Sequence, residues 1–255
     1  MKTVLTIAGS DSSGGAGIQA DLKTFEAFGV YGASAITVLT AQNTTGVQSI
    51  FPLSPSFAAE QLHSVLNDLR VDAIKIGMLY DAAIIDTVRA IIEPLGIPIV
   101  LDPVCVSKAG SPLLKDDAID SLREFSTVVT VSTPNLHEAY RLFGYQSGES
   151  DSLSLLMAHP APVLIKGHVM DNIIADLLYS GRQKRVFTSR KIETTNLHGS
   201  GCTYSSAIAA NLALGLGLEH AIERAKAYVT EAIRTAPGMG QGPGPLNHRE
   251  AGKSL

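Results

Sequence analysis

The stretch His198-Gly199-Ser200-Gly201-Cys202 is followed at once by an apolar run of small residues from Thr203 to Leu216. Glycines before such a run predict a loop that opens a helix, with a thiol on the first helical turn. The N–H groups and the positive dipole end of a helix N-terminus bind anions and lower the pKa of a nearby thiol. The stretch therefore predicts an anion-binding loop beside a cysteine that ionises readily.

Bland interpretations of the same residues stay open at this point. Cys202 is also the kind of small residue that is buried as a hydrophobe, which is the usual place of a free cysteine. His198 is equally a loop residue without a role. Placement on a predicted loop and helix does not by itself separate these alternatives.

Short apolar runs alternate with helix-patterned segments through most of the chain. Strands are expected at residues 3–8, 33–39, 73–78, 97–101, 128–131, 163–166, 173–179 and 184–188. Helices are expected at residues 18–28, 55–69, 82–92, 135–143, 203–216 and 219–235, with a surface helix or loop at 144–161. Strand and helix alternating with short connections predicts an α/β domain with a mainly parallel sheet and helices on both faces.

The domain boundaries follow from length and composition. The chain has 255 residues, which a single α/β domain can accommodate. No linker divides it into two cores, so one domain is predicted over residues 1–236. Residues 237–255 are rich in glycine and proline, and we expect a flexible C-terminal tail there.

Charge and cysteine content exclude several classes of partner. The net charge is −4 and no basic stripe stands out, so nucleic acid and anionic membranes are poor partners. The two cysteines, Cys105 and Cys202, have no metal-ligand spacing and make no disulfide scaffold, which favours a reducing cytoplasm. Neither a signal peptide nor a bilayer-spanning segment is recognisable.

Polar residues follow several of the predicted strands at their carboxyl ends. They are Asp11, Gln42, Asp102, Asn135 and Lys166. Ligands of open parallel sheets bind beyond these ends of the strands. A lysine that ends an apolar strand is costly when buried alone, so it either reaches solvent or meets an anion. The clustering predicts a binding site at this edge of the sheet.

Two of these positions have a structural and a functional interpretation. Asp102 is a turn residue, or it orients Mg²⁺ through water, since this ion favours carboxylates together with phosphates. Asn135 is typical of a helix N-cap, yet Asn135 and Glu138 are three residues apart and share one helix face. Capping and a role in the site are therefore compatible.

The N-terminal glycine loop spans residues 8–17 and reads AGSDSSGGAG. It lacks the Gly-Lys-Ser/Thr ending of a P-loop and the acidic residue of a dinucleotide fingerprint. It is either a plain strand-to-helix turn or a place where the backbone approaches a small ligand closely, with Asp21 on the helix that follows.

Residues 8–24 resemble the signature of the bacterial hydroxymethylpyrimidine and phosphomethylpyrimidine kinases of thiamine synthesis, which belong to the ribokinase-like superfamily. The resemblance continues in order along nearly the whole chain, through residues 40–44, 75–79, 102–104, 133–138 and 198–202. The N-terminal stretch and the cysteine-ended glycine loop are specific in combination, because most ribokinase relatives have aspartate in place of Cys202. One departure is Cys105, which stands where the family is expected to have methionine.

The resemblance implies a three-layer α/β/α sandwich without a separate lid domain, with ATP and Mg²⁺ as cofactors and a homodimer as the assembly. It implies an aminopyrimidine pocket formed by Gln42, Asp21, Gly9, Met78, Val104 and Cys105. It implies ATP contacts from Lys166, Asn135 and Lys226, and a magnesium site at Asp102 and Glu138. It implies a catalytic anion hole at Gly199, Ser200 and Gly201, beside Cys202 as a base or a positioning group.

The implied reaction is ATP-dependent phosphorylation of 4-amino-5-hydroxymethyl-2-methylpyrimidine to its monophosphate and then to its diphosphate. A pyridoxal kinase of the same superfamily is an alternative, because pyridoxal also carries a hydroxymethyl group on a flat nitrogen ring. Gln42 favours the aminopyrimidine, since an amide both donates and accepts hydrogen bonds. A non-catalytic small-molecule sensor with this fold is a second alternative.

Overall fold

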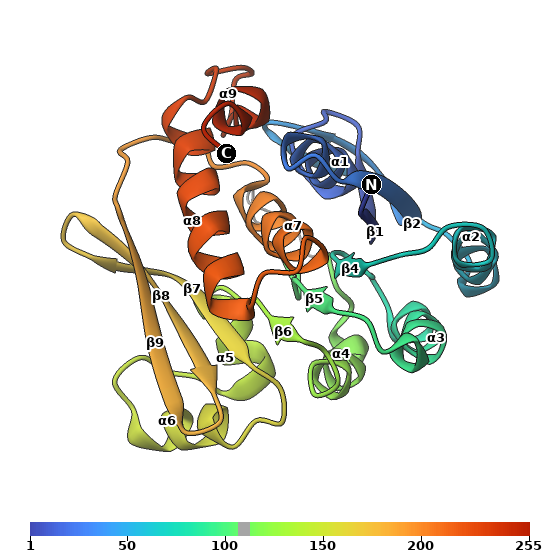
Figure 1. Ribbon diagram of the computed structural model, residues 1–255, viewed down its shortest axis with the longest axis horizontal. Coiled ribbons are helices and arrows are strands. Elements are labelled where there is room, and N and C mark those ends of the chain that lie inside the picture. Colours follow the sequence, from blue (N-terminus) through green and yellow to red (C-terminus); the bar gives the residue numbers. More distant parts are fainter. Residues whose placement is uncertain (107–112) are drawn as a thin grey trace.

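A computed structural model describes residues 1–106 and 113–255. Within these residues the strands form one sheet of nine, in the order β3-β2-β1-β4-β5-β6-β7-β8-β9 (Figure 1). The six central strands pair in parallel, in the order β2, β1, β4, β5, β6 and β7. Strand β3 at one edge and strands β8 and β9 at the other pair antiparallel. The predicted mainly parallel α/β sheet is confirmed.

The boundaries of the elements are as follows. The strands are β1 (Thr3–Asp11), β2 (Tyr31–Asn43), β3 (Gly46–Pro52), β4 (Ala73–Ile76), β5 (Ile99–Leu101), β6 (Val131–Ser132), β7 (Val163–Met170), β8 (Ile173–Ser180) and β9 (Gln183–Arg190). The helices are α1 (Gly17–Ala27), α2 (Pro55–Leu66), α3 (Ala82–Ile92), α4 (Ile119–Phe125), α5 (Leu136–Phe143), α6 (Ser150–Met157), α7 (Ser200–Ala213), α8 (Leu218–Arg234) and α9 (His248–Gly252).

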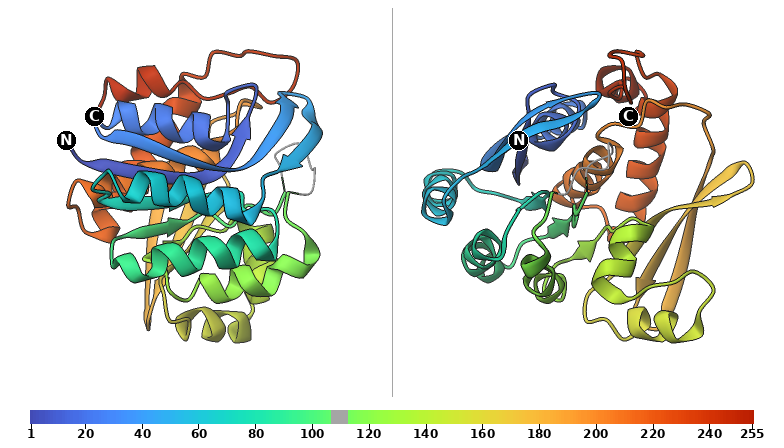
Figure 2. Two further views of the ribbon diagram at one scale, coloured as in Figure 1. Left: turned by 90° about the vertical axis from the view of Figure 1, so that its right-hand side faces the viewer. Right: turned by 180° about the vertical axis from the view of Figure 1, so that it is seen from behind.

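Helices cover both faces of the sheet and make the predicted three layers (Figure 2). Helices α1, α7, α8 and α9 share one hydrophobic cluster with strands β1, β4, β5 and β6. Helices α2, α3 and α4 pack on the opposite face in a second cluster. Residues of adjacent parallel strands point to both faces, so these strands read as continuous apolar runs.

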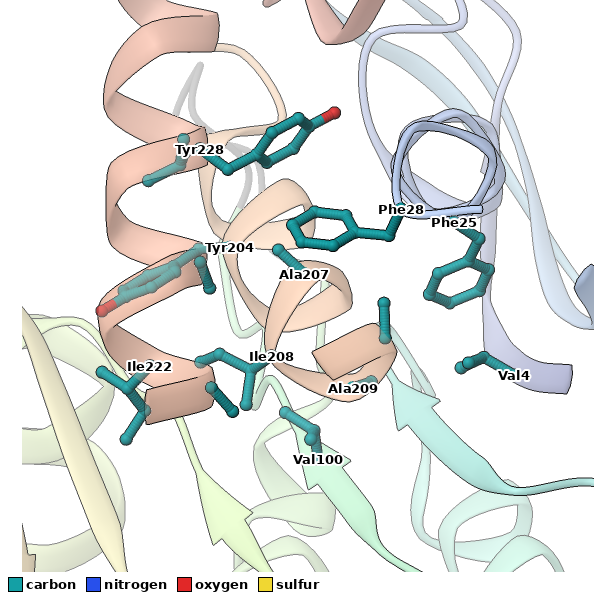
Figure 3. Packing of buried hydrophobic residues seen from close by; sticks show 14 of the residues in the cluster. Val4, Phe25, Phe28, Val100, Tyr204, Ala207, Ile208, Ala209, Ile222 and Tyr228 are labelled. Carbon is teal, nitrogen blue, oxygen red and sulfur yellow. The ribbon is translucent and has the colours of Figure 1, made fainter. Parts of the chain in front are cut away.

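Helix α7 lies in the middle of the first cluster (Figure 3). Its alanines, among them Ala207 and Ala209, are fully buried and let the helix approach the sheet closely. The ring of Phe28, the C-cap residue of α1, packs edge-on against Tyr228 on α8, with centroids 4.9 Å apart. Helix α7 is therefore packed against α1, α8 and the sheet.

The C-terminal segment is ordered by packing, so the expectation of a flexible tail over residues 237–255 is wrong. Leu246 and Ala251 are buried in the same cluster as α7 and α8. Pro245 forms a bridge with His198, beside the first turn of α7. Glycine serves close approach in this segment, because a Cβ at Gly242 would lie 2.1 Å from the carbonyl oxygen of Thr44.

The first strand pair at the edge extends further than its sequence pattern indicates. Strand β2 continues to Asn43, and β3 follows as an antiparallel partner that the periodicity does not reveal. Most residues of β3 are at least partly exposed, so it lacks the alternating apolar pattern on which strand prediction depends. Among the described residues no helix is long and apolar enough to cross a membrane.

Candidate active site

A cavity of about 770 Å³ opens at the carboxyl ends of the parallel strands. Most of the residues predicted for the site line it, although they come from distant parts of the chain: Gly9, Gln42, Met78, Asp102, Val104, Asn135, Glu138, Lys166, Gly199, Ser200, Gly201, Cys202 and Lys226. Asp21 and Cys105 are not among the lining residues. The clustering predicted at this edge of the sheet is confirmed for the residues that line the cavity.

Asp102 is at the centre of the charged part of the cavity. Its buried carboxylate pairs with the Nζ of Lys166 and accepts hydrogen bonds from the hydroxyls of Thr133, at 3.2 Å, and Ser205, at 3.3 Å. Burial lowers the pKa of Lys166, but Asp102 and Glu138 outweigh it and raise that pKa. Lys166, which lies in the middle of β7, is therefore a cation that faces the cavity with an acidic partner, as the interpretation in which it meets an anion requires.

Glu138 and Asn135 form a reciprocal capping box at the start of α5. The Asn135 Oδ1 accepts the N–H of Glu138 at 3.0 Å, and the Glu138 Oε2 accepts the N–H of Asn135 at 2.8 Å. Burial, together with nearby Asp102, raises the pKa of Glu138 to about 7 against the opposing charge of Lys166. Both residues also line the cavity, so capping and a place in the site coexist.

The carboxylates of the cavity fit a magnesium ion that is held partly by the protein and partly by the phosphates of a bound substrate. Among residues 1–106 and 113–255, no group of three histidine, cysteine or acidic side chains is arranged to hold a metal ion. Mg²⁺ is usually bound by one or two carboxylates together with substrate phosphates and water, rather than by a cage of protein ligands. Asp102 and Glu138 supply the carboxylates that such a site needs.

The glycine loop opens α7 as predicted. Gly199 is the N-cap residue with φ = 79°, and a Cβ there would lie 1.9 Å from the Gly15 carbonyl oxygen. A Cβ at Gly201 would lie 3.2 Å from the Lys166 Nζ. Gly201 and Cys202 occupy the first helical turn, where N–H groups have no partner within the helix. The loop thus sets backbone donors beside Asp102 and Lys166.

His198 and Asp11 tie this loop to the N-terminal glycine loop. The His198 Nε2 lies 2.8 Å from the Asp11 Oδ2. The same carboxylate accepts the N–H groups of Ser13, Gly15 and Ala16. His198 therefore has a partner in the fold, which the sequence could not show because the two residues are far apart along the chain.

Cys202 is partly exposed and lines the cavity, but its electrostatics differ from the sequence expectation. Burial raises the pKa of the thiol to about 11. The Lys75 ammonium and the N–H of Gly17 act in the opposite direction, while Asp21 and Asp102 add to the rise. The prediction that the thiol ionises more readily than a free cysteine is therefore wrong, because desolvation outweighs the helix terminus.

Asp21 lies behind the cavity rather than in its wall. It is fully buried, and its carboxylate pairs with the Nζ of Lys75 at 2.8 Å and accepts the hydroxyls of Thr6 and Ser206. Direct contact with a substrate, as expected for Asp21, is not what the structure shows. Lys75 lines the cavity in its place. A lysine inside the apolar strand at residues 73–78 was the signal that sequence reasoning left unused.

Met78 and Val104 give the cavity an apolar lining, and Gln42 also lines it. The Thr40 hydroxyl donates to the Ser10 carbonyl at 2.9 Å and lies 3.1 Å from the Gln42 Oε1. Gly9 is next to Met78, where a Cβ would lie 3.2 Å from the sulfur. Cys105 is fully buried with its thiol donating to the Pro103 carbonyl. Its expected place in the pocket wall is therefore wrong, because the side chain turns into the core.

Lys226 also lines the cavity, but it does not present a free charge. Its Nζ lies 2.7 Å from the Asp176 Oδ2, and the Asp176 Oδ1 accepts the N–H of Gly167 at 2.9 Å. Asp176 joins α8 to β7 at this end. Sequence reasoning missed it, since it is one polar residue within the apolar strand at 173–179.

A ribokinase-like small-molecule kinase is the class that this three-layer fold and this site define. The chain matches the family described as Phosphomethylpyrimidine kinase over residues 11–247. It is 46% identical over 252 residues to the hydroxymethylpyrimidine/phosphomethylpyrimidine kinase of Synechococcus elongatus, covering 96% of each chain. The chain belongs to the phosphomethylpyrimidine kinase family.

Further comparisons agree on the fold. The chain is 44% identical to the thiamine biosynthesis bifunctional protein ThiED of Geobacter sulfurreducens, and it spans about half of that protein, 52% of its length. A structure of Bacillus subtilis pyridoxal kinase with ADP superposes with a TM-score of 0.88 at 38% identity, covering 98% of each chain. The phosphomethylpyrimidine kinase of Clostridium difficile gives a TM-score of 0.78 at 39% identity, covering 91% of this chain and all of that one.

Proposed function

We propose that this chain uses ATP to phosphorylate hydroxymethylpyrimidine to its monophosphate and then the monophosphate to the diphosphate, in thiamine synthesis. The observation that carries the proposal is that Gln42, Met78 and Val104 line one cavity together with the glycine loop, Asp102 and Lys166. Membership of the phosphomethylpyrimidine kinase family supports the same substrate. One pocket serves both steps, because the product of the first is the acceptor of the second.

The residues of the cavity divide the work of phosphoryl transfer. Gln42 binds the ring edge with one donor and one acceptor, while Met78 and Val104 hold its faces. Lys166 and the N–H groups of the glycine loop stabilise charge on the transferring group, which is the main requirement of this chemistry. Asn135 and Lys226 border the nucleotide.

Cys202 is proposed as the acceptor of the proton from the hydroxymethyl group. An alcohol must lose its proton as it attacks phosphorus, whereas a phosphate oxygen is already largely ionised. The two reactions therefore differ in their need for a base. When bound, Mg²⁺ neutralises charge on the nucleotide phosphates, and Asp102 and Glu138 are the residues that would hold it.

Pyridoxal phosphorylation is the second candidate, and the superposition on Bacillus subtilis pyridoxal kinase favours its inclusion in any test. Pyridoxal has no aminopyrimidine edge for the Gln42 amide. We expect pyridoxal to be the poorer substrate, because the Gln42 amide is left without its hydrogen-bond partners when pyridoxal fills the pocket.

We extend the proposal to a homodimer in the cytoplasm. Leu39 and Phe51 are exposed, and they are opposite each other on β2 and β3 at the edge of the sheet. Such a pair is suited to burial against a second copy. Both cysteines are free thiols, which suits a reducing compartment. Light scattering in solution tests the dimer.

Coupled ADP release tests the activity, with hydroxymethylpyrimidine, its monophosphate and pyridoxal as acceptors in parallel. We expect turnover with both pyrimidines, and a Gln42→Leu variant that loses more of the pyrimidine reaction than of any pyridoxal reaction. Faster turnover of pyridoxal than of hydroxymethylpyrimidine would favour the second candidate. Binding of the pyrimidine without any ADP release would contradict a kinase and favour a sensor.

A further inference from the structure

A buried charged cluster lies directly beneath the cavity, on the side of Cys202. Its centre is the ion pair of Lys75 on β4 and Asp21 on α1, with 2.8 Å between Nζ and Oδ2 and both side chains fully buried. The Thr6 hydroxyl donates to Oδ2 at 2.6 Å, and the Ser206 hydroxyl donates to Oδ1 at 2.7 Å. These contacts hold the carboxylate firmly on three sides.

The position of Ser206 places this cluster relative to Cys202. The two residues are four apart on α7, and residues at this spacing are neighbours on one helix face. Ser206 reaches Asp21, and both Lys75 and Cys202 line the cavity. The Lys75 ammonium therefore lies on the face of α7 that presents the thiol. Gly77 makes room for it, since a Cβ there would be 2.8 Å from Nζ.

A purely structural role does not explain this ion pair well. Burying two charges costs desolvation energy that their attraction barely offsets, and apolar residues of similar size are often as stable or more so. Lys75 is the one polar residue in a strand whose other residues, Ala73, Ile74 and Ile76, are apolar and fully buried. The charge itself is thus the feature to be explained.

Charged groups face Cys202 from three elements, α1, β4 and β7, and from the loop after β5. Burial raises the pKa of the thiol, and Asp21 and Asp102 raise it further, whereas Lys75 is the leading opposing influence. Cys202 in turn contributes to the raised pKa of Lys166 on β7. The pKa of Lys75 is itself raised, because Asp21, Cys202 and Asp102 outweigh its burial. Lys75 therefore remains a cation while the thiol titrates.

We propose that Lys75 is a positioning residue for phosphoryl transfer, which keeps a positive charge beneath the Cys202 sulfur and favours its thiolate. The proposal rests on the proposed function for its role in catalysis. The thiol first gives its proton to solvent, leaving the thiolate paired with Lys75. The thiolate then takes the proton of the acceptor hydroxyl as the new O–P bond forms and the bond from phosphorus to the ADP oxygen breaks. Asp21 holds the lysine in place.

Site-resolved alkylation tests the proposal without substrate or ATP. The purified protein reacts with iodoacetamide at pH 8, and mass spectrometry follows the Cys202 peptide. We expect Lys75→Met to slow this reaction, by about threefold for each unit by which the thiol pKa rises. The thiolate fraction falls about tenfold for each unit, and the greater nucleophilicity of the remaining thiolate offsets part of this loss. We expect Asp21→Asn to accelerate it, because a charge that raises the pKa is removed.

The opposite signs separate electrostatics from damage to the fold, because loosened packing would expose the thiol and accelerate both variants. Lys184→Met, which removes an exposed lysine on β9, is the matched control and should leave the rate unchanged. If Lys75→Met does not fold, the double variant Lys75→Met/Asp21→Asn keeps the site neutral, and Cys202 should still react more slowly than in the wild type. Equal rates in the wild type and the lysine variant, or in the wild type and the double variant, would overturn the proposal.

The two proposals fail in distinguishable ways. A shift in thiol reactivity together with no turnover of either pyrimidine would leave the Lys75 assignment standing and contradict the proposed function. Turnover of both pyrimidines with unchanged thiol reactivity would do the reverse. In the active enzyme, Lys75→Met should reduce kcat with hydroxymethylpyrimidine more than kcat with its monophosphate.

Discussion

The Nε2 of His198 lies 2.8 Å from the Oδ2 of Asp11, so one hydrogen bond joins two glycine loops that are 187 residues apart in sequence. Asp11 also fixes its own loop through the N–H groups of Ser13, Gly15 and Ala16. The N-terminal loop is therefore a support for the loop at residues 199–201, in addition to being part of the cavity wall.

Asp11→Ala should lower the free energy of unfolding by at least about 2 kcal/mol, because it leaves several buried N–H groups and one histidine without an acceptor. Urea denaturation measures this change. Asp116→Ala, which removes an exposed partner of Arg141, should cost less than about 1 kcal/mol. Equal losses in the two variants would show that the loops hold together without Asp11.

Gly199→Ala should abolish most of the activity, whereas Gly215→Ala should not. Both glycines have positive φ, at 79° and 94°, so both variants carry about 1–2 kcal/mol of backbone strain. Only at Gly199 would the new methyl also collide with the Gly15 carbonyl, while the space around Gly215 is open. Displacing the loop by about 1 Å should reduce kcat about 100-fold.

Thermal unfolding and ADP release together check this pair of variants. A larger loss of Tm and a much lower kcat for Gly199→Ala than for Gly215→Ala are the expected result, because only the Gly199 methyl collides with another loop. Equal activities would contradict the close fit of the two loops, and a much larger loss of Tm for the Gly215 variant would contradict the assignment of strain alone at that position.

Cys202→Ser should slow phosphorylation of hydroxymethylpyrimidine by about 100-fold or more, as removal of a general base typically does. Phosphorylation of the monophosphate should fall by less than about tenfold, because a phosphate oxygen needs no base. Comparing kcat for the two acceptors measures the split. Cys105→Ser is the control, since that thiol is buried outside the cavity. Equal losses in both reactions would instead indicate that Cys202 only positions the acceptor.

His248 should make the protein less stable in acid. Burial, aided by nearby Lys23, lowers the pKa of His248 from 6.5 to about 4, and its Nε2 pairs with the Thr203 hydroxyl beside Cys202. A group whose pKa is depressed on folding stabilises the protein above its unfolded pKa and loses that contribution as the pH falls. The loss should reach about 3 kcal/mol between pH 6.5 and pH 4.

Urea denaturation at pH 7.5 and at pH 4.5 measures this loss, and His248→Gln should remove most of the difference between the two values. His63→Gln, at an exposed position on α2, should leave the difference as it is in the wild type. An unchanged pH dependence in the His248 variant would mean that other groups cause the acid instability.

Much of the fold and part of the site could be predicted from local pattern. The site at the carboxyl ends of the apolar strands, with Asp102, Asn135 and Lys166, could be predicted because parallel sheets collect such residues at one edge. The helix at residues 82–92 was predicted with its observed limits, because Asp81 caps it and Pro94 follows its end. The N-cap at Asn135 was equally visible, whereas the reciprocal hydrogen bond from Glu138 became apparent only in the structure.

Residues whose partners lie far along the chain could not be predicted in this way. Lys75 and Asp176 are single polar residues in apolar strands, and their meaning depends on Asp21 and Lys226, which are 54 and 50 residues away. The C-terminal segment was misjudged for a related reason. Glycine and proline indicate mobility only where no surface packs against them, and here Leu246 is buried in the core.

The sequence by itself determined the alternation of strands and helices in most of the chain, the loop that opens α7 and the family to which the chain belongs, because these depend on short-range patterns of apolar, glycine and polar residues. Only the tertiary structure decided which of the polar residues face the cavity, which lie behind it, and in which direction the thiol pKa moves. Burial and the distance between charges set these properties, and both exist only after distant segments have packed together.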